Sequence, residues 1–365
     1  TLTLGNNVTV TNTLTNNGTI ALGNSNYVLS FDTYTEGAGS AITVGNGSIT
    51  STAAAGPAQT VSRVTFTNTR TTTINGGAGG ITIASPVYDT TGLITTGIVS
   101  LPTGTIASLD VQSGTTTATE LTVNTTVGVE AAGTLILTGA NTVNGDLTIA
   151  GKFTATTDIL SLGGNLSLPV TASSFTASGG TIRFTGTGIQ TVNPGLNGAG
   201  TPNAFSTIDI AKTDGNITFT NPLTVTTLTQ GSANAVGITF NQNLTVTGAV
   251  TFNTSGTVTL GDAGTDVFTF NGGVSHTTAA HTRNTKLYGT LRTSDDVITL
   301  DNVILGSDSI IRSLDAAGAA VTVNGTITGG GYNLALISGN AAATVSGNAT
   351  GLGAVTLQNA TAAGT

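Results

Sequence analysis

Three aspartates near residue 300 are the residues best placed for acid–base chemistry. Asp295, Asp296 and Asp301 lie within one short stretch of the sequence. Two carboxylates can share the acid and base roles that cleavage of a glycosidic bond requires. A polysaccharide-active enzyme is therefore one hypothesis for this chain. It predicts that Asp295 and Asp296 converge with Arg283 and Lys286 in one groove.

Several features of the sequence weigh against this hypothesis. Enzymes resembling polygalacturonases also carry a Gly-His-Gly and an Arg-x-Lys motif downstream of the aspartates, and neither follows Asp296. Both histidines, His276 and His281, precede it. The sequence has no cysteine and no Gly-x-Ser-x-Gly elbow, so it offers no evident nucleophile. We therefore predict a solvated turn at the aspartates, assign no catalytic residue and expect no enzymatic activity.

Asp262 and Asp266 are the candidate metal ligands. They lie in the stretch Gly-Asp-Ala-Gly-Thr-Asp and could supply oxygen ligands to Ca²⁺. The calcium-binding pattern Gly-Gly-x-Gly-x-Asp does not repeat in the sequence, however. His276 and His281 could join either aspartate in a transition-metal site, but their spacing matches no zinc signature. We predict a turn at residues 261–266 and no bound cofactor, with Ca²⁺ at Asp262 and Asp266 as the alternative.

The elements that must position these residues are short strands. The dominant pattern alternates an apolar residue with Thr, Ser or Asn and ends at Gly or Asn, as in segments 133–139, 145–151 and 256–261. Such alternation predicts strands of about four to six residues with one buried and one Thr-rich face. Thr-x-Thr pairs such as Thr245 and Thr247 would lie on the solvent face, although flat rows of such pairs could instead bind ice. No stretch of ten or more residues shows a helical period, so the chain is predicted to be all-β.

Asn-Gly pairs recur between the expected strands and are predicted to form the corners that join them. Both residues tolerate a positive φ, which tight turns demand. The pairs are Asn17-Gly18, Asn46-Gly47, Asn75-Gly76, Asn144-Gly145, Asn197-Gly198, Asn271-Gly272 and Asn324-Gly325.

Degenerate strand–turn units follow one another along the whole chain. This favours a parallel β-solenoid over a string of β-sandwich domains. Coils of roughly 20 residues predict about 15–20 short rungs in a single solenoid over residues 1–365. Segments 193–205 and 276–286 break the pattern and are predicted to be loops that leave the solenoid. Polar side chains at equivalent positions of successive rungs are expected to hydrogen-bond one another.

Amino-acid composition limits which molecules the chain can bind and whether it can cross a membrane as a helix. Charged residues make up 7% of the 365 residues, the net charge is -8, and the nine basic residues form no stripe, so nucleic acid is a poor partner. No run of eighteen apolar residues exists, so no transmembrane helix is predicted. The chain contains no Met, which indicates a mature chain or a fragment.

Repeated units of the form Gly-x-Leu-Thr-Val/Ile, the stretch 178–192 and the segment 347–357 resemble repeats of large bacterial surface proteins. These families are autotransporter passengers and filamentous-haemagglutinin-like adhesins, which are right-handed parallel β-helices. The resemblance implies export, surface display and a rod. We therefore expect an extracellular structural protein of a cell-surface fibre, S-layer or sheath, or adhesin, which self-associates through solenoid ends or faces into filaments or a coat. A monomeric adhesin stalk that binds host or matrix glycans and a polysaccharide-active enzyme are the alternatives.

Overall fold

The computed structural model shows an all-β chain. It describes residues 1–23, 26–44, 47–53, 58–66, 72–87, 92–168, 175–197, 199–231, 233–314, 319–339 and 341–358, and these contain no helix. Parallel strands stack into a β-solenoid of about 15 turns, which confirms the predicted fold and rung number. The chain divides into two compact units, Thr1–Gly180 and Thr181–Thr365, and each is described by itself. The single solenoid over residues 1–365 stays a prediction.

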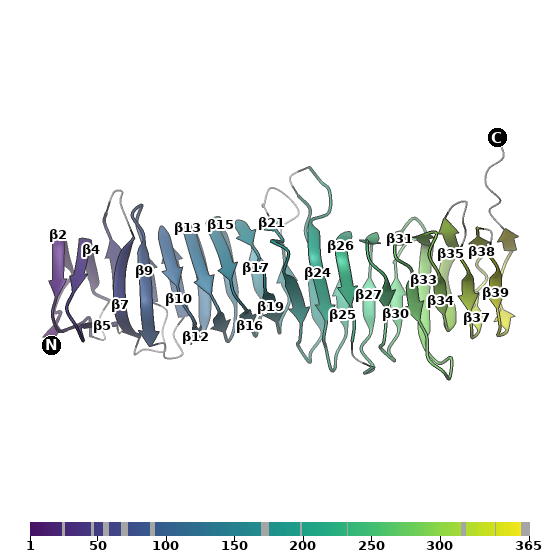
Figure 1. Ribbon diagram of the computed structural model, residues 1–365, viewed down its shortest axis with the longest axis horizontal. Coiled ribbons are helices and arrows are strands. Elements are labelled where there is room, and N and C mark those ends of the chain that lie inside the picture. Colours follow the sequence, from purple (N-terminus) through teal and green to yellow (C-terminus); the bar gives the residue numbers. More distant parts are fainter. Residues whose placement is uncertain are drawn as a thin grey trace. The chain divides into compact units, whose positions relative to one another are not determined.

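In the first unit, strands of successive turns lie side by side in parallel register (Figure 1). The strands are, in chain order, β1 (Leu2–Thr3), β2 (Val8–Asn16), β3 (Thr19–Ala21), β4 (Val28–Glu36), β5 (Ala41–Val44), β6 (Ser48–Ser51), β7 (Gln59–Phe66), β8 (Thr72–Asn75), β9 (Ile81–Val87), β10 (Gly92–Thr96), β11 (Ile98–Leu101), β12 (Gly104–Ile106), β13 (Ser108–Thr119), β14 (Leu121–Val123), β15 (Val127–Thr138), β16 (Asn141–Val143), β17 (Leu147–Ile149), β18 (Lys152–Thr154), β19 (Ile159–Leu162), β20 (Leu166–Ser167) and β21 (Phe175–Thr176).

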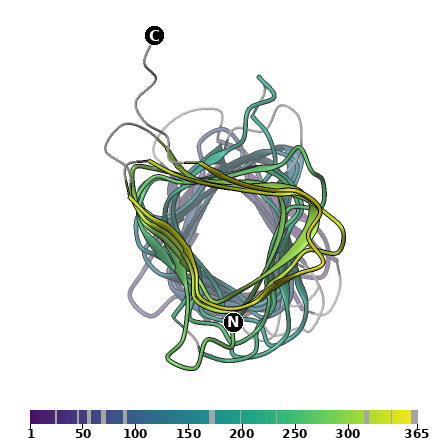
Figure 2. The ribbon, with the colours of Figure 1, turned by 90° about the vertical axis from the view of Figure 1, so that its right-hand side faces the viewer.

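The second unit repeats this arrangement, and Figure 2 shows its last turns, in green and yellow, winding around a closed ring in end view. Its strands are β22 (Thr181–Phe184), β23 (Gln190–Asn193), β24 (Ala204–Ile210), β25 (Ile217–Phe219), β26 (Leu223–Thr229), β27 (Ile238–Phe240), β28 (Leu244–Val246), β29 (Val250–Thr251), β30 (Val258–Leu260), β31 (Val267–Phe270), β32 (Val274–His276), β33 (Asn284–Ser294), β34 (Ile298–Leu300), β35 (Asn302–Leu314), β36 (Val321–Val323), β37 (Ile327–Thr328), β38 (Leu334–Ser338), β39 (Ala343–Val345), β40 (Ala349–Thr350) and β41 (Val355–Gln358).

From β29 onward, the turns of the second unit contribute to three parallel sheets. The first contains β29, β32, β34, β36 and β39; the second β23, β25, β27, β30, β33, β35, β37 and β40; and the third β26, β28, β31, β33, β35, β38 and β41. Strands β33 and β35 belong to two sheets because they continue around a corner, where their mutual register shifts. This is why they are longer than the alternation predicts.

The interior is built from columns of apolar side chains, one from each turn. Ile217 pairs with Ile238, and Phe219 pairs with Phe240, in adjacent strands. The rings of Phe219 and Phe240 are stacked with centroids 4.8 Å apart and an interplanar angle of 13°. Both are fully buried. The parallel register thus places like side chains over one another, and their burial supplies the main stabilising free energy.

The outward positions carry hydroxyl side chains. Thr191, Thr218, Thr239 and Thr259 occupy one outward row on β23, β25, β27 and β30. Their spacing in the sequence is uneven, and only the register of the turns aligns them. Because the strands are about 4.8 Å apart, the hydroxyls form a regular array.

Corner side chains tie each turn to the next, as the expected polar ladders require. The Oδ1 atoms of Asn216, Asn243 and Asn302 accept hydrogen bonds from the backbone N–H of residues 21 to 24 positions later in the chain, at 2.8–3.0 Å. In the first unit, Asn7 Oδ1 accepts from Val28 N at 2.9 Å in the same way. The asparagines therefore satisfy main-chain donors at the corners that the sheet ladders leave unpaired.

The Asn-Gly pairs that the structure describes lie at strand ends, where corners were predicted, but they do not use the positive φ that both residues tolerate. None of Gly18, Gly76, Gly145, Gly272 and Gly325 is among the described residues with positive φ, nor are the asparagines. Glycine is needed at most of these corners for a different reason. A Cβ on Gly76 would lie 1.7 Å from Ile98 O, and one on Gly145 would lie 1.8 Å from Thr125 O. The backbones of adjacent turns approach too closely at the corner for any side chain.

The two predicted loops lie between strands. Residues 194–203 separate β23 from β24, and within their described part Leu196 and Pro202 form an antiparallel bridge while Asn203 Nδ2 donates to Pro194 O at 2.9 Å. Residues 277–283 separate β32 from β33. This second loop is shorter than segment 276–286, because its two ends are already in strands.

Candidate functional site

The candidate calcium ligands hold their own turn together. Asp266 is buried, and its Oδ2 accepts backbone N–H groups of Asp262 and Ala263 at 3.1 and 2.9 Å. Asp262 is exposed. Across the described residues, no three His, Cys, Asp or Glu side chains gather into a group that could hold a metal ion. The turn predicted at residues 261–266 is present, and Ca²⁺ at these aspartates stays an alternative.

The aspartates near residue 300 occupy opposite ends of one strand. Asp295 and Asp296 precede β34, and Asp301 follows it. Asp296 lines an open hollow of about 260 Å³ together with Val297 and Thr299. Asp301 is fully buried. The structure therefore separates Asp296 from Asp301 by a strand and places them in different surroundings.

Asp301 organises the loop at residues 277–283. Its Oδ2 accepts from the Thr278 backbone N–H at 2.8 Å, and its Oδ1 is 3.1 Å from His281 Nδ1. It also accepts from the Arg283 backbone N–H at 3.3 Å. Burial by itself would raise the pKa of Asp301, but these hydrogen bonds outweigh burial and lower the pKa below its usual value.

The two basic residues that the enzyme hypothesis invokes face elsewhere. The Arg283 guanidinium donates to the backbone oxygens of Phe252 and Asn253 at 2.7 and 2.8 Å. Lys286 Nζ lies over the ring of Tyr288, 5.0 Å from its centroid. Each therefore has a contact of its own that stabilises the solenoid surface.

The two histidines have different surroundings. His276 is buried: its Nδ1 lies 2.9 Å from Thr285 Oγ1, and its Nε2 lies 3.3 Å from Thr254 O. The ring packs against Phe252 in an edge-on contact. Burial lowers the pKa of His276 to about 4. His281 is half exposed and contacts Asp301, so the structure gives the two imidazoles no shared ligand position.

Lys212 is a buried cation that sequence reasoning missed. Its Nζ donates to the Gly186 and Gly188 backbone oxygens and to Gln190 Oε1, the last at 2.9 Å. Burial lowers the pKa of this ammonium group. No sequence signal marks it, because Gln190 and Lys212 meet only when consecutive turns stack.

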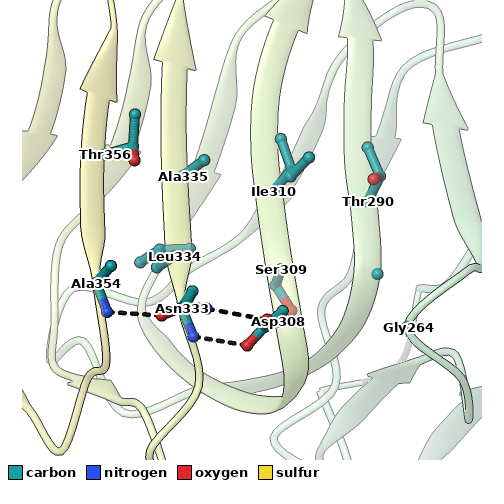
Figure 3. A pocket seen from close by; sticks show the side chains of 11 residues that line it. Gly264, Thr290, Asp308, Ser309, Ile310, Asn333, Leu334, Ala335, Ala354 and Thr356 are labelled. Carbon is teal, nitrogen blue, oxygen red and sulfur yellow. Dashed lines mark hydrogen bonds between the residues drawn. The ribbon is translucent and has the colours of Figure 1, made fainter.

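A groove on the second unit, called here the corner groove, has a volume of about 330 Å³. It crosses β33, β35, β38 and β41 near the corner where the second sheet meets the third (Figure 3). Its lining residues are Gly264, Gly289, Thr290, Asp308, Ser309, Ile310, Asn333, Leu334, Ala335, Ala354 and Thr356.

One edge of the corner groove is a chain of polar groups. Asp308 Oδ1 accepts from Asn333 N at 2.9 Å, and Asp308 Oδ2 accepts from Asn333 Nδ2 at 3.0 Å. Asn333 Oδ1 in turn accepts from Ala354 N at 2.7 Å (Figure 3). The partners lie more than 20 residues apart, so the register of the turns assembles this edge.

The other edge is a row of outward side chains. Thr290, Ile310, Ala335 and Thr356 are register partners on neighbouring strands (Figure 3). Between the edges, Gly289 adds no side chain to the floor. It has φ of 73°, and a Cβ there would lie 2.3 Å from Asp266 O.

In comparisons with known proteins, no protein-family model, no curated protein and no solved structure matches the chain. Within the described residues, no helix is both long and apolar enough to cross a membrane. The expected relationship to autotransporter passengers and filamentous-haemagglutinin-like adhesins therefore stays a resemblance between repeated sequence units.

Proposed function

We propose that this chain is an extracellular structural element of a bacterial surface fibre, sheath or adhesin. The observation that supports the proposal most directly is the continuous bonding from turn to turn in each unit. Parallel main-chain ladders join successive strands, and corner side chains such as Asn216 and Asn302 bridge the same turns. A force applied across the turns is shared among many such bonds, which suits a mechanical role.

We further propose that copies of the chain associate through β41. Val355 and Leu357 of β41 continue the columns of Leu334 and Leu336, which are buried. Yet Val355 is 51% exposed and Leu357 is 68% exposed. Among the described residues β41 pairs with β38 alone, and a turn from a second copy laid over it would bury both side chains.

Electron microscopy and sedimentation at low and high protein concentration test this proposal. Filaments that form as the concentration rises support a self-assembling element. We expect Leu357→Lys to suppress them, because it places a charge in the buried contact, while Gln358→Lys, a neighbouring exposed position, leaves them intact. Isolated particles at every concentration would refute self-association and leave the monomeric stalk.

A further inference from the structure

We propose that the corner groove binds a neutral oligosaccharide in an extended conformation, lying across the strands. This inference is independent of the self-association proposed above. It starts from the direction of the groove, which passes over β33, β35, β38 and β41 in turn. Neighbouring strands are about 4.8 Å apart, so a linear ligand that lies in the groove crosses one strand at each such step.

On the sheet face under the groove, β35 and β38 are paired on both sides and have no main-chain groups to offer a peptide. β33, β35, β38 and β41 pair with one another through their parallel ladder. A peptide that binds by adding a strand needs a free sheet edge, and the groove lies on the sheet face. Recognition at this surface therefore depends on side chains.

The lining side chains suit sugar hydroxyls. Asp308 uses one acceptor position on each carboxylate oxygen for Asn333, and each oxygen has a second lone pair. Asn333 Nδ2 has a second N–H besides the one given to Asp308. Within the described residues, the hydroxyls of Thr290 and Thr356 have no side-chain hydrogen-bond partner. The groove thus presents acceptors, a donor and hydroxyls, which complement groups that both donate and accept.

Charge favours a neutral ligand. Asp308 is the ionisable side chain of the groove lining, which contains no lysine or arginine, and the whole chain has a net charge of -8. An acidic polysaccharide or a nucleic acid would be repelled, because nothing in the lining compensates its charge. Ile310 and Ala335 supply a small apolar surface for the C–H face of a sugar ring.

The test uses the full chain and four neutral tetrasaccharides, namely cellotetraose, xylotetraose, mannotetraose and chitotetraose, with tetragalacturonate as the acidic comparison. Affinity is measured by calorimetry or by NMR titration. We expect at least one neutral tetrasaccharide to bind and tetragalacturonate to bind more weakly.

Ala335→Trp is designed to fill the groove without disturbing the core, since Ala335 points outward from β38. The matched control is Ile337→Trp, on the same outward side of the same strand but outside the groove lining. We expect Ala335→Trp to weaken binding by about tenfold or more and Ile337→Trp to leave it unchanged. Circular dichroism verifies that both variants fold. If no neutral tetrasaccharide binds, or if Ala335→Trp binds as well as the unmodified chain, the proposal is overturned.

Discussion

Acidification should destabilise the second unit through His276, the buried last residue of β32, directly before the loop at residues 277–283. In the folded chain the imidazole is neutral, with Thr285 Oγ1 and Thr254 O as its partners. Protonation would place a charge in a site closed to water, near the Arg283 guanidinium, which also lowers the pKa. The folded state therefore resists the proton that the unfolded chain accepts.

The sign and size of the effect follow from linkage. The pKa of His276 falls from 6.5 to about 4 on folding, so between these values the unfolded chain binds more protons. The contribution of neutral His276 to stability is present above pH 6.5 and is lost as the pH falls toward 4. A shift of this size implies a loss of about 2 kcal/mol in the free energy of unfolding by pH 5 and about 3 kcal/mol by pH 4.

The assay is favourable because the chain contains only two histidines. Side-chain NMR signals give the titration midpoint of each, and His281→Gln assigns them. Urea unfolding at pH 7, 6, 5 and 4 gives the change in stability. His276→Phe places a ring like that of neighbouring Phe252 at this position, so it should flatten the pH dependence between 4 and 6.5.

Two results would refute this reasoning. A His276 midpoint near 6.5 would mean that the imidazole is not buried as the structure shows. An unchanged pH dependence in His276→Phe would assign the acid sensitivity to other groups. Asp301 should add little to the pH dependence in this range. Its pKa is lowered below its usual value, so its contribution to the free energy of unfolding is lost only at more acid pH.

Two further predictions concern stability at neutral pH, measured by thermal and urea unfolding. Gly145→Ala should lower the free energy of unfolding by roughly 3 kcal/mol, since its Cβ would overlap Thr125 O. Gly18→Ala, which has no atom within 4 Å of the new Cβ, should lower it far less. Equal losses in the two variants would contradict the close-approach explanation. Lys212→Met should cost about 1–3 kcal/mol, because it removes the ammonium donor of the buried Gln190 Oε1. The exposed Lys152→Met is its control, and a neutral effect of Lys212→Met would show that water replaces the ammonium group.

Much of the fold was predictable because it depends on local chemistry. Alternation of Val, Ile and Leu with Thr predicts strands with two unlike faces, and segment 256–261 indeed contains β30, with Val258 and Leu260 inward. The polar residues at the corners follow from the same pattern, but the asparagines bond to backbone N–H groups of the next turn, as Asn216 does with Gly237. The sequence did not show why glycine is needed at these corners, because the reason is the close approach of the backbone of another turn, as between Gly145 and Thr125.

The candidate site was far less predictable. Asp308 and Asn333 form one edge of the corner groove, but neither belongs to a motif, and residues 25 positions apart meet only through the register of β35 and β38. The aspartates that stood out in the sequence, Asp296 and Asp301, are separated by β34.

By itself, the amino-acid sequence determined that the chain forms short strands with an aliphatic interior and hydroxyl-bearing faces, because side-chain alternation acts within a few residues. Only the tertiary structure decided which polar side chains are buried and partnered, as with Lys212 and His276, and where a groove opens. The physical reason is that the number of residues per turn varies, so contacts between turns depend on a register that no local pattern contains.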